Sequence, residues 1–247
     1  MKILALIPAR MESSRFPGKP MASIHDKPMI GHVFERVSKS NLLTLTAVAT
    51  CNKEIADYIN SIGGRAVMTG NHHERASDRC AEALKILERE ENEVYDIIVM
   101  VQGDEPMTEC EMIDEAVAPM LKNTSIQVVN LMASIESDEE FEDKNCIKVV
   151  CDLQNNALYF SREPIPTRTR VPQAPLWKQV CIIPFRRNFL LEYIEMEPTP
   201  LEEAESIDMM RVLEHGLNVL MVPTKHSTHA VDTPDDLRRV EELIPDS

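Results

Sequence analysis

The sequence predicts an α/β fold in which helices cover both faces of a mostly parallel sheet. Short apolar runs that suit buried strands alternate with amphipathic segments along the first half of the chain. One run, residues 3–7, leads into a polar loop that reaches Pro20, and another, residues 97–101, ends at a Gly-Asp turn. Because ligands of such folds bind beyond the carboxyl ends of the strands, both loops are candidate binding segments.

The first half of the chain contains signals for four strands and four helices. Strands are expected at residues 3–7, 45–50, 66–68 and 97–101, and helices at 28–39, 53–62, 78–91 and 108–121. Met29, Val33 and Val37 fall on one stripe of the first helix, which predicts a buried face. Gly63 would end the second helix and Ser77 would cap the third.

The second half changes character. Strands are expected at residues 126–134, 147–152, 157–160, 180–185 and 219–223, and residues 164–175, which are rich in proline, are expected to be extended. One helix is expected from 202 to 215, ending at Gly216, and a last one from 233 to 243, entered through Pro234. Because the sequence contains no internal repeat and no flexible linker, residues 1–247 are predicted to form one domain.

Composition limits the classes of partner. A chain of 247 residues with 43% hydrophobic residues can bury a large core. The net charge of -15 repels nucleic acid and anionic membranes, so neither is an expected partner. A site for phosphate groups would need a local excess of cations.

The sequence is that expected of a cytoplasmic protein. No apolar run approaches the roughly 20 residues of a membrane span. The apolar run at residues 3–9 is also too short for a signal peptide. The six cysteines include no Cys-x-x-Cys pair, so buried reduced thiols are expected.

Three cations follow the first predicted strand within ten residues: Arg10, Arg15 and Lys19. Ser14 and Gly18 are small enough to let backbone amides approach a ligand. Amides and cations in this arrangement suit a triphosphate, although the Gly-x4-Gly-Lys-Ser/Thr loop is absent. The alternative interpretation is an exposed basic loop, since such charges are usually at the surface.

Two acidic segments are candidates for binding a metal. Asp104 follows the buried strand at 97–101, where a carboxylate could hold Mg²⁺ together with substrate phosphates. The alternative for Asp104 is a strand-ending turn. Asp232 lies just before the last helix, and its alternative role is that of a helix cap.

Together these segments resemble the 3-deoxy-manno-octulosonate (Kdo) cytidylyltransferase family, also called CMP-Kdo synthetase. The resemblance covers nearly the whole chain, and its markers are IPARMESSRFPGKPMASIHDKPMIGHVFERV (7–37), VQGDEP (101–106), IKVVCDLQNNALYFSREPIP (147–166) and VDTPDDLRRVEEL (231–243). It implies a nucleotidyltransferase-type, Rossmann-like fold, usually homodimeric, that uses CTP, Mg²⁺ and an acidic eight-carbon sugar. It divides the chain into a nucleotide-binding part (1–125), a sugar-binding and dimerisation part (126–230) and a metal-ligand segment with the last helix (231–247).

The resemblance assigns the nucleotide site to the first part of the chain. It implies that the nucleotide is bound by Ala9, Arg10, Ser14, Arg15, Lys19, Ser77, Asp78, Arg79 and Gln102. Lys19, Arg10 and Asp104 take catalytic roles, and Asp104 and Asp232 match the metal-binding carboxylates. One segment departs from the pattern, because Arg75-Ala76-Ser77-Asp78-Arg79 stands where the family usually has Ser-Gly-Thr-Asp-Arg.

The acceptor side departs further from the family pattern. The resemblance implies substrate-binding positions at Gln102, Arg162, Gln179, Ile183, Asp208 and Met209. A His and a Tyr that contact Kdo are replaced by Gln179 and Ile183, and a Glu-Gln pair by Asp208-Met209. Ile183 and Met209 would leave sugar hydroxyls without hydrogen-bond partners, so weak use of Kdo is predicted.

The predicted reaction is in-line attack of a sugar hydroxyl on the α-phosphorus of CTP, with release of pyrophosphate. One alternative is the same chemistry on another 2-keto-sugar acid, a phosphonate or a phosphate. Another is a non-catalytic nucleotide-binding regulator, although retention of Asp104 and Asp232 favours an enzyme. A dinucleotide-binding dehydrogenase is disfavoured, because Gly-x-Gly-x-x-Gly does not follow the first strand.

Overall fold

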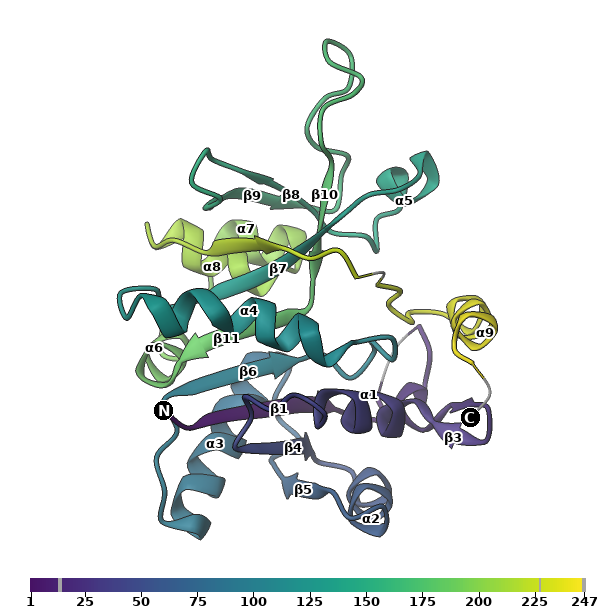
Figure 1. Ribbon diagram of the computed structural model, residues 1–247, viewed down its shortest axis with the longest axis vertical. Helices are drawn as coiled ribbons and strands as arrows, with labels where there is room; N and C mark the ends of the chain where they lie inside the picture. Colours follow the sequence, from purple (N-terminus) through teal and green to yellow (C-terminus); the bar gives the residue numbers. More distant parts are fainter. Residues whose placement is uncertain (13–14, 227, 246–247) are drawn as a thin grey trace.

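Two five-stranded sheets, one above the other in Figure 1, form the framework of this computed structural model, which describes residues 1–12, 15–226 and 228–245. The strands are β1 Ile3–Ala9, β2 Ser23–Ile24, β3 Lys27–Pro28, β4 Leu45–Thr50, β5 Arg65–Met68, β6 Ile97–Val101, β7 Val129–Ser134, β8 Lys148–Cys151, β9 Ala157–Ser161, β10 Trp177–Val180, β11 Ile182–Arg186 and β12 Leu220–Pro223. The helices are η1 Lys19–Met21, α1 Met29–Val37, α2 Lys53–Ser61, α3 Ala76–Glu91, α4 Cys110–Lys122, α5 Asp138–Glu142, α6 Arg187–Tyr193, α7 Pro200–Glu205, α8 Asp208–Glu214 and α9 Pro234–Leu243.

The first sheet has the predicted parallel core. Its strand order is β11-β6-β1-β4-β5, in which β1, β4, β5 and β6 are parallel. Strand β11 joins this sheet antiparallel to β6, although it belongs to the part of the chain expected to bind the sugar. One strand of the predicted sugar-binding part therefore belongs to the sheet of the predicted nucleotide-binding part.

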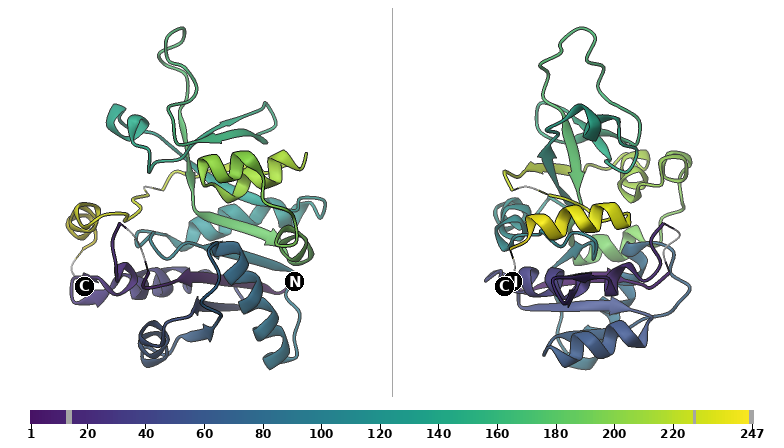
Figure 2. Two further views of the ribbon diagram at one scale, coloured as in Figure 1. Left: turned by 180° about the vertical axis from the view of Figure 1, so that it is seen from behind. Right: turned by 90° about the vertical axis from the view of Figure 1, so that its right-hand side faces the viewer.

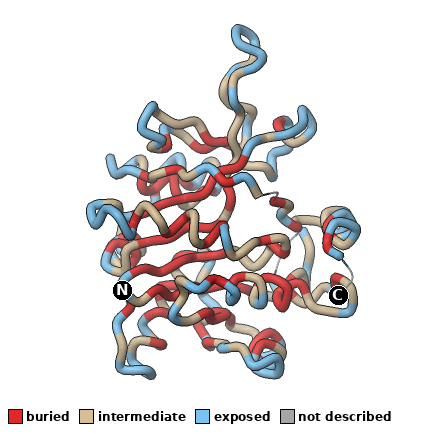
Figure 3. The backbone as a smooth tube through the Cα atoms, viewed as in Figure 1, coloured by how far each residue is buried: buried red, intermediate tan, exposed pale blue. Residues whose placement is uncertain are grey.

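Side chains of β1 alternate between two buried clusters. Leu4 and Leu6 pack in the cluster that contains the buried face of α3, whereas Ile3, Ala5 and Ile7 pack in the cluster of α1 and α4. Since successive side chains of a strand point to opposite faces, a strand covered on both faces reads as a continuous apolar run. The helices lie on opposite sides of the sheet in the front and back views, and Figure 3 shows the buried backbone through its centre.

The second sheet, in the order β12-β7-β10-β8-β9, builds the upper lobe in Figure 1. Strand β10 pairs antiparallel with β7, and after Cys181 the same chain continues as β11 in the first sheet. The predicted single run at 180–185 is therefore divided between two sheets. The proline-rich segment between β9 and β10 forms the arm at the top of the figure.

The predicted helix from 202 to 215 is wrong, because the structure has two helices there. Helix α7 ends at Glu205, and the next residue, Ser206, adopts a left-handed conformation with φ of 53°. Helix α8 begins at Asp208, and the turn between the helices directs the Asp208 carboxylate toward Ser77 and Arg75 of the first lobe. Smaller differences are that β7 begins at Val129 and that only Cys80 among the six free cysteines is fully buried.

The last helix, α9, packs against the start of the chain. Its Val240 and the following Ile244 cluster with Ile24 and Met29. The ring Nε2 of His25 lies 2.8 Å from the Glu241 carbonyl and 2.9 Å from that of Ile244. This packing brings Asp232, which immediately precedes the helix, beside the loop that follows β1. Figure 2 shows α9 from its outer side.

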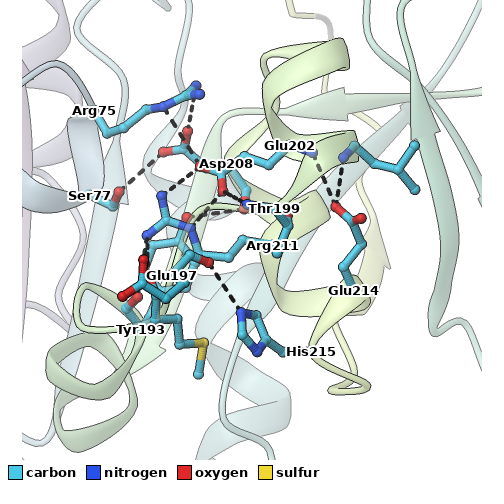
Figure 4. A network of polar contacts seen from close by, with 12 residues as sticks. Arg75, Ser77, Tyr193, Glu197, Thr199, Glu202, Asp208, Arg211, Glu214 and His215 are labelled. Carbon is cyan, nitrogen blue, oxygen red and sulfur yellow. Dashed lines mark hydrogen bonds and ion pairs between the residues drawn. The ribbon is translucent and has the colours of Figure 1, made fainter.

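A buried ion pair joins α7 to α8 (Figure 4). Arg211 donates two hydrogen bonds to the Glu202 carboxylate, at 2.6 and 2.7 Å, and Glu202 is fully buried. Two parallel bonds between a guanidinium and a carboxylate are the strongest form of such a pair. The pair fixes the angle between the two short helices. Within residues 1–12, 15–226 and 228–245, no helix combines the length and apolar character needed to cross a membrane.

Replacing Arg211 should therefore destabilise the fold. Arg211→Ala leaves the Glu202 carboxylate buried without its main partner, and the free energy of unfolding should fall by about 3–5 kcal/mol in urea titrations. The control is Arg65→Ala, which breaks an exposed ion pair to Glu90 and should cost less than about 1 kcal/mol. Equal losses in the two variants would contradict this role of Arg211.

Candidate functional site

A large cleft lies where the two lobes meet, beyond the carboxyl ends of β1 and β6. The first lobe contributes Ala9, Arg10, Arg15, Lys19, Arg79, Gln102, Asp104 and, from β11, Ile183, and the second contributes Arg162, Gln179 and Asp208. Asp232 lines the cleft from the segment before α9. The cleft thus collects side chains from seven separate segments of the sequence, between residue 9 and residue 232.

Lys19 is held between two carboxylates in this cleft. Its Nζ lies 2.8 Å from Asp104 Oδ2 and 3.4 Å from Asp232 Oδ1, and it also donates to the Val231 carbonyl at 2.7 Å. Burial by itself would lower the pKa of Lys19, but the charges of Asp104 and Asp232 outweigh it and raise the pKa above its ordinary value. Lys19 therefore stays charged, and its single positive charge offsets part of the repulsion between the two acids.

Two glycines position these groups. Gly18 has φ of 75°, which ends the β1 loop and starts the short η1 helix at Lys19. Gly103 allows a close approach of the two loops, because a Cβ there would lie 3.1 Å from the Pro8 carbonyl oxygen and 3.2 Å from Ile30 Cδ1. The Asp104 carbonyl then accepts the Val231 amide at 2.9 Å, which joins the β6 loop to the Asp232 segment.

The two other predicted cations take different positions. The Arg15 guanidinium lies 2.9 Å from Asp232 Oδ1 and also donates to Asn145 of the second lobe. Arg10 is exposed, and it donates to the His73 carbonyl at 3.4 Å. Ser14, the remaining predicted member of this loop, lies outside the described residues. The loop thus lines the cleft with three positive charges.

Asp232 is not the N-cap of the last helix. Thr233 is the N-cap of α9, with its hydroxyl accepting the Asp236 amide at 3.3 Å. Asp232 instead faces Lys19 and Arg15. Its carboxylate and that of Asp104 meet at one ammonium group, which is a suitable place for a hard divalent cation. The described residues include no group of three or more His, Cys, Asp or Glu side chains arranged around one metal, so phosphate and water oxygens would complete the coordination.

The cleft is lined by three of the four residues that are predicted to bind the acceptor and that depart from the family pattern. Gln179 donates its amide to Asn130 Oδ1 at 2.6 Å, and Ile183 presents a side chain that is only 2% exposed. Asp208 accepts hydrogen bonds from Arg75 and Ser77, each at 3.2 Å. Met209 does not line the cleft, contrary to expectation. It is fully buried in the core, because adjacent positions on a helix point in different directions.

The remaining predicted residues differ in their exposure to the cleft. Arg79 and Gln102 line it, and Arg79 is held by Thr69 Oγ1 at 2.6 Å and the Gly70 carbonyl at 3.1 Å. Ser77 and Asp78, although described, are not among the cleft-lining residues. Arg162 lines the cleft, but its guanidinium donates to the carbonyls of Lys144, Glu205 and Ser206.

Three cleft residues were missed by sequence reasoning. Asn145 contacts Arg15, Arg75 contacts Asp208, and Glu105 adjoins Asp104. Burial, together with the charge of Asp104, raises the pKa of Glu105 to about 8. The position of Arg75 was visible as a departure from the family pattern, whereas nothing in the sequence distinguishes Asn145.

Comparison with known proteins agrees with this geometry. Residues 4–222 match the family described as cytidylyltransferase. A Geobacter metallireducens protein named 3-deoxy-manno-octulosonate cytidylyltransferase is 43% identical, over 99% of this chain and 98% of its own length. An Acaryochloris marina protein of the same name is 35% identical, over 99% of this chain and 98% of its own length.

Solved structures give the same result. A structure titled CMP:2-keto-3-deoxy-manno-octonic acid synthetase complexed with CTP superposes with a TM-score of 0.88, at 34% identity and 98% coverage of both chains. A cytidylyltransferase from Leptospira borgpetersenii, 19% identical, shares the fold with a TM-score of 0.65 over 98% of this chain and 85% of its own. The match over most of the sequence, together with the cation loop and paired acids of the cleft, shows that this chain belongs to the cytidylyltransferase family.

Proposed function

We propose that this protein transfers CMP from CTP to an acidic sugar of the Kdo type and releases pyrophosphate. The observation that carries the proposal is the Lys19 ammonium between Asp104 and Asp232, in a cleft lined by the triphosphate-type loop on one side and by acceptor residues on the other. The relatives and the CTP-bound neighbour support the same reaction by their names.

The residues of the cleft can supply positioning and charge, which are what phosphoryl-type transfer mainly requires. Arg10, Arg15 and Lys19 would bind the triphosphate and stabilise the charge that develops on the departing pyrophosphate. The acceptor hydroxyl would be presented from the second lobe. The in-line geometry then depends on how the two lobes are held together.

Asp104 and Asp232 fit a magnesium site, and we propose that they bind this ion. Carboxylates with substrate phosphates are the usual ligand set of Mg²⁺, which would neutralise phosphate charge and activate the acceptor oxygen when bound. Lys19, which belongs to the proposed triphosphate loop, lies close enough to both acids to offset part of their charge. This arrangement would keep the acids together before the substrates bind.

CTP should be strongly preferred over ATP and GTP in a pyrophosphate-release assay with Kdo and Mg²⁺. Lys19→Ala should lower kcat/KM by about 10²-fold or more, because it removes one preorganised charge from the transition state. Lys53→Ala, which removes an exposed lysine of α2, is the matched control and should behave like the wild type. Active enzyme with a preference for a purine nucleotide would overturn the proposed function.

Asp104→Asn and Asp232→Asn should each weaken activation by Mg²⁺ in a metal titration, since each keeps the side chain's size but removes its charge. If both acids bind one metal, the fold-loss of activity in the double variant should be much smaller than the product of the two single fold-losses. Asp235→Asn, on the exposed start of α9, is the control. A wild-type Mg²⁺ titration for Asp232→Asn would leave it only an electrostatic partner of Lys19.

A related 2-keto acid is a second candidate acceptor, and the wall of the cleft favours it. Ile183 offers hydrocarbon where a hydroxyl would need a partner, and the Gln179 amide nitrogen is already used by Asn130. A buried hydroxyl without a partner costs about 1–3 kcal/mol, or roughly tenfold to a hundredfold in binding. An acceptor with an apolar or amino group at this place would avoid the cost.

The double change Gln179→His, Ile183→Tyr should therefore raise kcat/KM for Kdo by about tenfold or more while leaving the KM for CTP unchanged. Steady-state assays with each substrate varied in turn would measure both quantities. Efficient turnover of Kdo by the unmodified protein, with no gain in the double variant, would identify Kdo as the natural acceptor.

We also propose that the protein acts as a homodimer in the cytoplasm, where CTP is available. Large exposed apolar side chains on the second lobe, Leu153, Leu158 and Val171, support a dimer contact there. Light scattering of the full chain would give its mass in solution.

A further inference from the structure

Two separate departures from the family pattern contact each other in the structure. Arg75 stands in the segment that usually reads Ser-Gly-Thr-Asp-Arg, and Asp208 stands where the family has Glu. The two positions are 133 residues apart, and the Arg75 guanidinium donates to Asp208 Oδ1 at 3.2 Å (Figure 4). Both side chains line the cleft, Arg75 with 27% and Asp208 with 18% of the side chain exposed.

This contact connects the two lobes. Arg75 is the N-cap residue of α3, which packs on the first sheet, whereas Asp208 begins α8, which packs on β9 of the second sheet. The Asp208 carboxylate also accepts a hydrogen bond from the Ser77 hydroxyl of α3, at 3.2 Å. An acid of the acceptor lobe is thus oriented by side chains of the nucleotide lobe.

Neutralising the buried acid nearby does not require Arg75. Glu202 is already bound by two hydrogen bonds from Arg211, at 2.6 and 2.7 Å, while Arg75 Nε lies 3.7 Å away. The hydrogen bonds of Arg75 go instead to Asp208 and, at 3.4 Å, to the Ser206 hydroxyl. Arg75 therefore contacts the turn between α7 and α8 through hydrogen bonds, in addition to its longer ion pair with Glu202.

That turn is held from two sides. Arg162 donates to the carbonyls of Glu205 and Ser206, at 2.6 and 3.3 Å, from the acceptor lobe, and Arg75 donates to it from the nucleotide lobe. The turn includes the left-handed residue Ser206, a conformation that non-glycine residues adopt only when their surroundings impose it. Without Arg75, Asp208 keeps the hydrogen bonds from the Ser77 and Tyr193 hydroxyls but loses the ion pair to its carboxylate.

We propose that Arg75 is a positioning residue for the acceptor: its ion pair with Asp208 fixes the α7–α8 turn against the nucleotide lobe and thereby sets which acid the cleft accepts. The inference rests on the proposed transfer to an acidic sugar. It adds a specificity determinant on the nucleotide lobe, outside the residues that the family pattern assigns to the acceptor. Burial raises the pKa of the Asp208 carboxyl, and the neighbouring charge of Arg75 opposes this rise.

The first test is the steady-state kinetics of Arg75→Ala with CTP and Kdo. Losing one hydrogen bond to a charged group should raise the KM for the acceptor about tenfold, with the KM for CTP within twofold of the wild type. Arg75→Lys keeps the charge but not the planar guanidinium. Its KM for the acceptor should therefore lie between those of the wild type and Arg75→Ala. The control is Arg65→Ala, which removes an arginine from an exposed contact between β5 and α3 and should leave both constants unchanged.

A double-mutant cycle tests whether Arg75 acts through Asp208. Asp208→Asn should raise the KM for the acceptor, and adding Arg75→Ala to it should cause little further change, because the two single changes remove the same contact. Multiplicative effects, or an equal rise in both KM values for Arg75→Ala, would overturn the proposal.

Hydrogen exchange tests the contact without any substrate. In Arg75→Ala, amides of residues 205–209 should exchange about tenfold faster than in the wild type, while those of β1 and β6 stay protected. Unchanged exchange at 205–209 would contradict the positioning role even if the protein is active. Faster exchange in a protein that releases no pyrophosphate with Kdo would instead count against the proposed function alone. Arg75→Lys gives the same comparison if Arg75→Ala fails to fold.

Discussion

The arrangement of the cleft depends on the charge balance around Lys19. Two acids from distant segments, Asp104 after β6 and Asp232 before α9, approach a single ammonium group that also binds the Val231 carbonyl. Without a cation between them, the acids would repel each other in a partly buried place where water screens charge poorly. Lys19 therefore connects the β1 loop, the β6 loop and the segment before α9. Arg15 contacts both Asp232 and Asn145, and so connects these charged groups to the second lobe.

The nucleotide lobe could be predicted well from the sequence for a physical reason. Its strands are covered on both faces, so they read as short apolar runs, and their carboxyl ends coincide with the loops that carry charge. The pairing of Asp104 with Asp232 was accessible only through family resemblance. Residues 104 and 232 come close together because α9 packs against the start of the chain. No local sequence pattern predicts this long-range contact.

The acceptor lobe was predicted less well because tertiary contacts override local preference there. Residues 202–215 have no internal glycine or proline, so they resemble one helix, yet the chain turns at Ser206 under the contacts from Arg75 and Arg162. Motif matching placed both Asp208 and Met209 in the site. A helix turns by about 100° per residue, so only one of two adjacent side chains can face the cleft, and Met209 faces the core.

The strand that passes from one sheet to the other constrains the mechanics of the molecule. Val180 is paired with Leu131 in the second sheet, Ile182 with Val101 in the first, and the Cys181 carbonyl between them accepts the Gln102 amide at 3.1 Å. The lobes share a continuous backbone at this point, so they cannot slide past each other without breaking ladder hydrogen bonds. Bending about the Cys181 crossing would break the fewest of these hydrogen bonds, and such bending would displace groups far from the crossing more than groups beside it.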